Sequence, residues 1–151
     1  MNLLTTASAI AAEVDRRLKT ITQANGYETN IGATTFRGKL RIEDSLVPCG
    51  VLIEGSDTVE ARPGRIPQCE IAQSYVIGGY VPCDPDNPND AAHAVLRDIK
   101  RSVFSGNANL DGRVKIVRYK GRDIGPRADG QPIVFAVVEL EVEYVEDLTK
   151  P

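Results

Sequence analysis

The segment at 137–147, VVELEVEYVED, alternates between apolar and acidic residues, and this pattern constrains the fold more than any other stretch. Successive side chains of a β-strand point to opposite faces of a sheet. A strand over this segment would place its apolar side chains on one face and the carboxylates of Glu139, Glu141 and Glu143 on the other. We therefore expect a sheet with one face in the core and a row of acids on its other face.

Just before this row, at 133–138, both faces of the same strand are apolar. A sheet that carries helices on one face leaves its other face uncovered. We expect Ile133, Phe135 and Val137 to form a subunit interface with another copy of the chain. The alternative is that a long loop of the same chain folds over them.

Two interpretations of the acidic row remain open. Arg113 and Lys115 stand on an expected neighbouring strand, where antiparallel pairing would place them opposite Glu139 and Glu141. Such cross-strand pairs stabilise a sheet by roughly 0.2–1 kcal/mol each. The alternative is an acidic face that lines a passage for a polyanion, because repulsion between like charges prevents the polyanion from sticking.

An N-terminal helix is predicted over 3–21, where apolar residues beginning at Leu3 recur at spacings of three and four. Its other side carries two pairs at helical i,i+4 spacing, Glu13 with Arg17 and Asp15 with Lys19. We expect both pairs to lie on the solvent side of this helix.

The rest of the chain predicts five strands and one more helix. Asn87, Pro88 and Asp90 have the sequence of a capped helix start, and apolar residues at helical spacing follow them. β-Branched segments bounded by turn residues predict the strands, the first three antiparallel and the last two a hairpin: 29–36, 49–61, 69–81, 113–121 and 133–147. The order α-β-β-β-α-β-β indicates an α+β fold, a single domain over 1–151. Its antiparallel or mixed sheet of about five strands carries two helices mainly on one face.

The chain offers few of the groups that enzymes and nucleic-acid binders use. Its one histidine, His93, has no nucleophile or ligand at a motif spacing, and its three cysteines form no CxxC pair. The net charge of −3 and an aromatic content of 5% disfavour a dedicated nucleic-acid-binding module. We expect no catalytic residue, no metal ligand, no cofactor, and neither a signal peptide nor a membrane span.

Two polar segments, 37–46 and 121–132, are expected to be loops. A charged loop exposed to solvent is the simpler interpretation of each. The alternative is that they dock axially onto an acidic partner surface or onto DNA phosphates at a portal. Their candidate docking residues are Arg37, Lys39, Arg41, Arg122 and Arg127.

Several segments together carry a resemblance to a known family. They are the helix ASAIAAEVDRRLKTI, the following NGYETNIG, the LVP step in EDSLVPCGVLIEG, a second helix, and the closing strand VVELEVEYVED. In order and length the chain resembles the tail-terminator, or tail-completion, proteins of long-tailed bacteriophages. The resemblance implies a non-enzymatic virion protein of the tail and neck region, assembled in the cytoplasm of the host bacterium.

The resemblance also implies partners. They are further copies of the chain in a hexameric ring, the tail tube protein that the ring caps, and a head-side connector or neck protein. Genomic DNA would pass through the acidic lumen without specific binding. Two alternatives stay open: another head–tail joining protein such as a head-closure or neck ring, or a small cytosolic enzyme or ligand-binding domain that uses acids such as Asp84 and Glu70.

Overall fold

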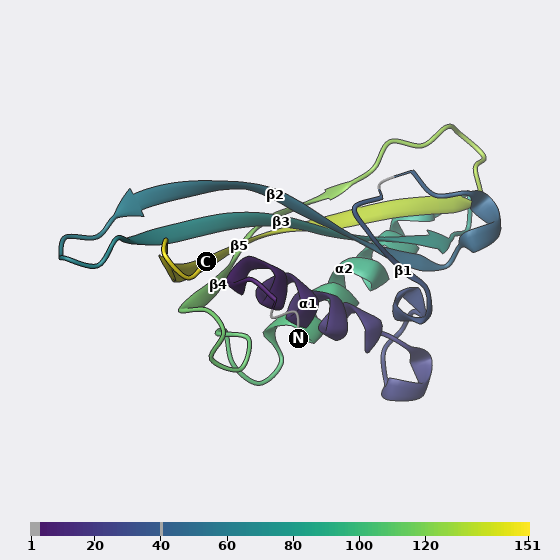
Figure 1. Ribbon diagram of the computed structural model, residues 1–151. Coiled ribbons are helices and arrows are strands. Elements are labelled where there is room, and N and C mark those ends of the chain that lie inside the picture. The colour runs from purple at the N-terminus through teal and green to yellow at the C-terminus, as the bar shows by residue number, and fades with distance from the viewer. Residues whose placement is uncertain (1–3, 40) are drawn as a thin grey trace.

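The computed structural model describes residues 4–39 and 41–151, and it shows the predicted α+β fold (Figure 1). Leu3, the first residue of the predicted helical stripe, lies outside the described residues, as does position 40 of the segment 37–46. The helices and strands follow the predicted order: α1 (Thr6–Lys19), β1 (Thr35–Arg37), β2 (Cys49–Ala61), β3 (Gln68–Pro82), α2 (Pro88–Phe104), β4 (Ile116–Ile124) and β5 (Ile133–Asp147). Short 3-10 turns lie at Gln23–Asn25, Ile31–Ala33 and Asp44–Leu46.

The strands form one mixed sheet in the order β1-β2-β3-β5-β4. The pairs β2–β3, β3–β5 and β5–β4 are antiparallel, and β4 with β5 is the predicted hairpin. β1 instead runs parallel to β2, with Thr35 opposite Gly50. The prediction that the first three strands are antiparallel is therefore wrong for β1, because the chain between β1 and β2 is long enough to return to the same end of the sheet before it re-enters.

Both helices cover the same face of the sheet, as predicted (Figure 1). The core between these layers contains Val14 and Leu18 from α1, Ile99 from α2, and the even-numbered residues of β5 from Val134 to Tyr144. These β5 side chains are at most 4% exposed, which confirms the alternation seen in the sequence. Burial of each large aliphatic side chain contributes roughly 1.5–3 kcal/mol.

The two predicted ion pairs of α1 have different surroundings. Lys19 Nζ lies 2.6 Å from Asp15 Oδ2 on the outer side of the helix, as expected. Glu13 and Arg17 are 7% and 5% exposed, so the prediction that this pair faces solvent is wrong. Glu13 accepts hydrogen bonds from Arg16 at 2.7 Å and from Arg17 at 3.2 Å, which lower its pKa from 4.5 to about 2, the Arg16 bond most strongly.

Arg17 is buried because it closes the end of the neighbouring helix. Its Nη1 donates hydrogen bonds to the carbonyl oxygens of Val103, at 2.7 Å, and Ser105, at 3.2 Å, at the C-terminal end of α2. The last carbonyls of a helix have no partner within it and attract positive charge. A cation that joins α1 to α2 here needs a buried carboxylate beside it, and Glu13 supplies that carboxylate.

The start of α2 agrees with the sequence in part. Pro88 occupies the first turn, as predicted. The Asn87 side chain does not cap the helix, contrary to expectation, and its Nδ2 donates instead to Asp84 Oδ2 at 3.4 Å. The turn that precedes α2 thus competes for the Asn87 amide.

β2 and β3 extend beyond the helices as an arm, and the last residues of β5 accompany them, because β5 pairs with β3 as far as Gln68 (Figure 1). Every residue from 54 to 67 is exposed, and a bulge interrupts the pairing between Glu54 and Asp57. Because β1 pairs only with 50–52 of β2, the outer edge of β2 from 53 to 61 has no neighbouring strand in the described chain. β4 forms the opposite edge of the sheet.

Candidate functional site

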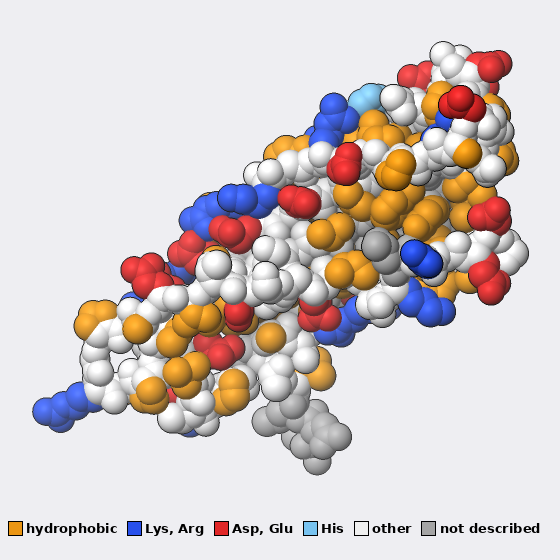
Figure 2. Space-filling model, turned by 90° about the horizontal axis from the view of Figure 1, so that it is seen from above, with side chains coloured by type: hydrophobic (Ala, Val, Ile, Leu, Met, Phe, Trp, Pro, Cys, Tyr) orange, Lys and Arg blue, Asp and Glu red, His pale blue; other side chains and the backbone are white. Residues whose placement is uncertain are grey.

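The face of the sheet that carries no helix is the candidate functional site, and we call it the open face. The odd-numbered residues of β5 lie on it, because the even-numbered ones are buried under the helices. Along β5 this face has an apolar half, at Ile133, Phe135 and Val137, and an acidic half, beginning at Glu139. Figure 2 shows the largest patch of apolar side chains toward one end of this face and a group of acidic and basic side chains along the edge beyond it.

In the apolar half, Phe135 lies flat over the neighbouring strand. Its ring stacks on Tyr80, with the centroids 4.2 Å apart and the planes at 22°. Gly78 makes this arrangement possible, because a Cβ there would come within 2.7 Å of Phe135 and 2.8 Å of Val137. On the next strand Val51, opposite Gly78, is fully buried. The apolar half is therefore an ordered second cluster on the open face.

A loop of the same chain covers part of this half. Residues 125–132 and 41–48 rise over the open face at the end of the sheet away from the arm (Figure 1). Gly125 N donates to Phe135 O at 2.7 Å, so the loop is held against β5. Ile133, Phe135 and Val137 nevertheless stay only half-buried. The loop that the sequence offered as an alternative cover is present, but it leaves apolar surface exposed.

The three carboxylates of the acidic half have unequal partners. Arg118, on β4, lies 2.7 Å from Glu143 and 3.6 Å from Glu141. The hydrogen bond to Glu143 raises the pKa of Arg118 above its usual value. Glu139 is exposed, and within the described chain it forms no ion pair. The row is thus neutralised at one end only.

The basic residues that the sequence placed opposite these acids lie elsewhere. Arg113 Nε is 4.0 Å from Glu13, and Lys115 bonds to Glu70 on β3. β4 begins only at Ile116, so both residues precede the paired part of the strand. The prediction that Arg113 and Lys115 face the acidic row is therefore wrong, and Arg118 takes that position.

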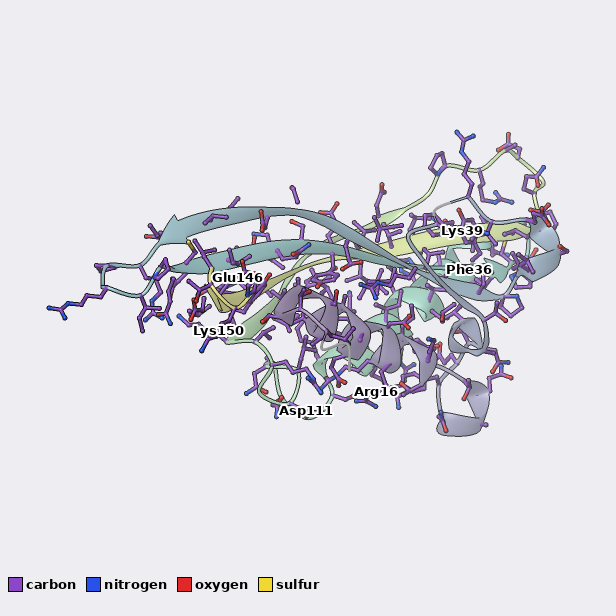
Figure 3. The ribbon with its side chains drawn as sticks, viewed as in Figure 1. Arg16, Phe36, Lys39, Asp111, Glu146 and Lys150 are labelled. Atoms are coloured by element: carbon purple, nitrogen blue, oxygen red, sulfur yellow. The ribbon has the colours of Figure 1, made fainter. Side chains whose placement is uncertain are left out.

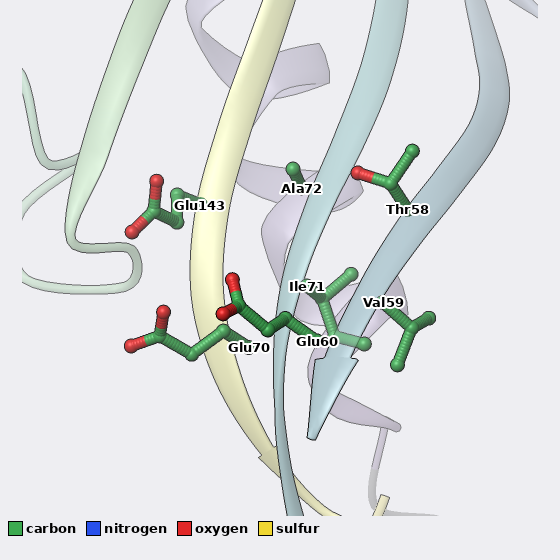
Figure 4. A pocket seen from close by; sticks show the side chains of 7 residues that line it. All are labelled: Thr58, Val59, Glu60, Glu70, Ile71, Ala72 and Glu143. Carbon is green, nitrogen blue, oxygen red and sulfur yellow. The ribbon is translucent and has the colours of Figure 1, made fainter. Parts of the chain in front are cut away.

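A shallow hollow of about 540 Å³ extends the acidic half across β3 to the arm (Figure 4). Glu60, Glu70 and Glu143 enter it from three different strands. Lys115 pairs with Glu70, while Glu60 has no ion pair in the part of the chain that the structure describes. The described residues contain no group of three or more His, Cys, Asp or Glu arranged to hold a metal ion. This surface is suited to repel anions.

The basic residues of the first predicted loop are partly held by the fold. Arg37 ends β1 and forms two hydrogen bonds with Glu54, at 2.9 and 3.1 Å, so it does not project as a loop residue. Lys39 Nζ lies 5.3 Å from the centre of the Phe36 ring (Figure 3). Arg41 is exposed. Lys39 and Arg41 are available to a partner, and Arg37 is already paired.

The second predicted loop begins later than expected. Residues 121–124 belong to β4, so the prediction of a loop over 121–132 is wrong for its first part. Arg122 lies on the helix side of the strand, where its Nη1 is 3.3 Å from Nδ1 of His93 on α2. Arg127 is in the loop itself and donates a hydrogen bond to the backbone oxygen of Gln131.

Arg122 also belongs to a basic hollow that we did not predict. It has a volume of about 530 Å³ and is lined by His93, Leu96, Arg97, Lys100, Arg101 and Arg122. Arg97, Lys100 and Arg101 stand three and four residues apart on α2 and therefore share one side of it. That spacing is visible in the sequence, whereas the approach of β4 to this side of the helix is not.

Neither described helix is long and apolar enough to cross a membrane. In comparisons with known proteins, no family model and no curated protein matches this chain. Its surfaces are therefore the basis on which its function can be inferred.

Proposed function

We propose that this chain is a phage tail terminator: a structural protein that closes into a homohexameric ring, caps the tail tube and joins the tail to the head-side connector. The observation that carries the proposal is the divided open face of the sheet. One half of this face is apolar and half-exposed, and the other is acidic and only partly neutralised. The layout of the whole chain, which resembles that family, supports the same function.

The apolar half supports self-association. Ile133, Phe135 and Val137 lie side by side on β5 beside Tyr80, and each keeps part of its surface exposed although the nearby loop is folded against the strand. Contiguous apolar surface and unpaired strand edges are common features of assembly interfaces. In the proposed ring, neighbouring copies shield this half.

The acidic half supports a lumen through which DNA passes. Glu139 carries an uncompensated charge, and Glu60, Glu70 and Glu143 lie together in the adjoining hollow. Carboxylates repel the phosphates of DNA over roughly 8–10 Å at physiological ionic strength. A ring lined by such a face would let DNA move through without holding it.

The ends of the sheet supply the axial contacts of the proposed ring. Lys39, Arg41 and Arg127 lie at the end where the loops rise over the open face, and the arm lies at the other end. In this arrangement one end of the ring meets the tail tube and the other meets the connector. Because only one side of the ring matches the tail tube, no further tube subunits can bind to its other side, and the tube stops growing.

Native mass spectrometry and tube polymerisation together test the proposal. We expect a six-copy species from the purified chain. Added to polymerising tail tube protein, it should shorten the tubes and appear as a cap at one end by electron microscopy. A ring that leaves tube length unchanged would indicate a different head–tail joining protein, and a chain that stays single-copy at high concentration would contradict the proposal.

A further inference from the structure

Both edges of the sheet lack a neighbouring strand in the described chain. β4 is one edge, and only its start is covered, where Val117 N donates to Ala108 O at 2.7 Å; the arm part of β2, from 53 to 61, is the other. Unpaired backbone N–H and C=O groups along an edge are a template for pairing with another strand. Each copy therefore offers two different edges, which is what a head-to-tail ring requires.

The directions of these edges are compatible. β2 and β3, β3 and β5, and β5 and β4 are antiparallel pairs, so β2 and β4 run in opposite directions within one copy. Rotation about a ring axis keeps every strand in the same direction relative to that axis. β2 of one subunit would therefore meet β4 of the next as an antiparallel partner, which is the commoner pairing.

The charges of the two edges are complementary. Along the free part of β2 the charged residues are all acidic: Glu54, Asp57 and Glu60. Along β4 the charged residues are mainly basic: Arg118, Lys120 and Arg122 are basic, and Asp123 is acidic. Opposite charges across a strand pair stabilise it, and like charges oppose it. Two copies of β2 or two copies of β4 would repel each other, which disfavours a symmetric dimer through either edge.

We propose that β4 of each subunit pairs with the arm of β2 of the next subunit, in a register that places Val59 opposite Tyr119. This inference deepens the proposed function and depends on it, because it identifies a second contact between neighbouring subunits of the ring, in addition to the apolar half of the open face. The same register places Asp57 opposite Arg122 and Glu60 opposite Arg118. Val59 and Tyr119 are 59% and 44% exposed in the single chain, and this pairing covers both.

On β4, the faces of the sheet agree with this register. Tyr119 lies on the helix side, where Lys100 Nζ is 4.6 Å from its ring, and Arg122 contacts His93 on the same side. Arg118 lies on the open face beside Glu143. β4 has an extra residue, Lys120, between Tyr119 and Gly121, which returns Arg122 to the helix side.

On β2, the matching residues lie on the matching faces. Val59 is paired with Ile71, which is buried in the core on the helix side of the sheet. Val59 therefore points to the helix side, and Asp57 lies two residues away on the same side. Glu60 lies on the open face, where it enters the hollow with Glu143. All three proposed pairs thus join side chains of the same face.

The register also displaces neighbouring subunits along the strands. Within one copy, Tyr119 pairs with Leu140, Leu140 with Tyr75, and Tyr75 with Glu54. Tyr119 and Glu54 therefore lie in the same row across the sheet. Val59 lies five residues beyond Glu54, so the next subunit is shifted by that distance along β2. A stagger of this kind is needed when a sheet closes into a barrel with tilted strands.

Cysteine cross-linking tests the register directly. The background is Cys83→Ser, since Cys83 is the half-buried thiol while the other two cysteines are buried. Opposite residues of a strand pair are close enough for a disulfide. Under mild oxidation, the variant with both Val59→Cys and Tyr119→Cys should give a ladder of covalent oligomers. Each single variant should give none, and an equal mixture of the two single variants should stop at covalent dimers.

The matched control is Thr58→Cys with Tyr119→Cys, because Thr58 points to the opposite face. We expect at least a tenfold weaker ladder from it. Charge reversal gives an independent readout: Asp57→Arg and Arg122→Asp should each abolish the ring peak in size-exclusion chromatography. Mixing the two variants should restore it, because an alternating ring of even number pairs opposite charges at every contact.

The outcomes separate this inference from the proposed function. If the wild type forms rings but the Val59–Tyr119 pair gives no ladder, or no more than the Thr58 control, this edge pairing is wrong and the proposed ring stands. If the wild type is single-copy at high concentration, both are wrong. A ladder specific to the Val59–Tyr119 pair, together with charge rescue, supports the pairing.

Discussion

Replacing Glu13 by Gln should destabilise the fold and remove much of its sensitivity to acid. Glu13 is 7% exposed and accepts hydrogen bonds from Arg16 and Arg17, and Arg17 in turn holds the C-terminal end of α2. Glutamine keeps the size of the side chain but not its charge. It leaves Arg17 with only the exposed carboxylate of Asp111, 3.5 Å away, and burial of a cation without a buried partner is unfavourable.

The size of the effect follows from the pKa of Glu13, which is about 2 in the folded chain against 4.5 as the reference value. A difference of one in pKa corresponds to about 1.4 kcal/mol, so the ionised carboxylate contributes about 3 kcal/mol. Because the folded pKa is the lower one, this contribution is fully present above pH 4.5. It should be lost progressively as the pH falls from 4.5 toward 2.

Urea unfolding followed by far-UV circular dichroism, at fixed protein concentration and at several pH values from 7 to 2.5, measures this contribution. At pH 7 the free energy of unfolding of Glu13→Gln should be lower than that of the wild type by about 3 kcal/mol, and the difference should shrink below pH 4.5. The matched control is Glu139→Gln, at an exposed carboxylate, with an expected change within about 0.5 kcal/mol. If wild type and Glu13→Gln lose stability in parallel as the pH falls, the buried pair does not act as described.

Three further substitutions test other parts of the structure. Phe135→Asp should give folded monomers, because it places a charge in the apolar half of the open face; a variant that still elutes as a ring would refute that interface. Gly78→Ala should lower the free energy of unfolding by about 1–3 kcal/mol, since its Cβ would lie 2.7 Å from Phe135, and combining it with Phe135→Leu should recover part of that loss. Asp98→Ala should lower the free energy of unfolding by about 3 kcal/mol. The buried N–H and hydroxyl of Thr29, which donate to the Asp98 carboxylate at 2.8 and 2.7 Å, would lose their acceptor. An unchanged urea midpoint would contradict this.

The alternation along β5 was sufficient to predict which of its side chains are buried. Because side chains alternate between the two faces of a strand, the apolar set lies on one face and the acidic set on the other, and the helices cover the apolar face. The order of elements and the hairpin of β4 with β5 follow equally from local patterns and turn residues. These features depend on residues close together in the sequence.

Features that depend on distant residues were missed for identifiable reasons. Charged side chains at i,i+4 spacing predict a pair on the surface. Arg17 is buried instead because it donates to a carbonyl oxygen at the end of α2, and no pattern in the sequence of α1 indicates this contact. Arg118, rather than Arg113, faces the acidic row because the start of β4 sets the register. The parallel strand β1 is only three residues long, too short for a periodic signal.

The two-sided character of β5 restricts how its length can change. One residue inserted in the middle of this strand would turn Glu139, Glu141 and Glu143 under the helices and send their apolar neighbours outward. Two inserted residues would restore both faces beyond the insertion, at the expense of the hydrogen-bond register with β3 and β4. Among chains that descend from this one, gaps and insertions in the strand should therefore come in even numbers, while the tip of the arm at 62–67 can gain or lose any number.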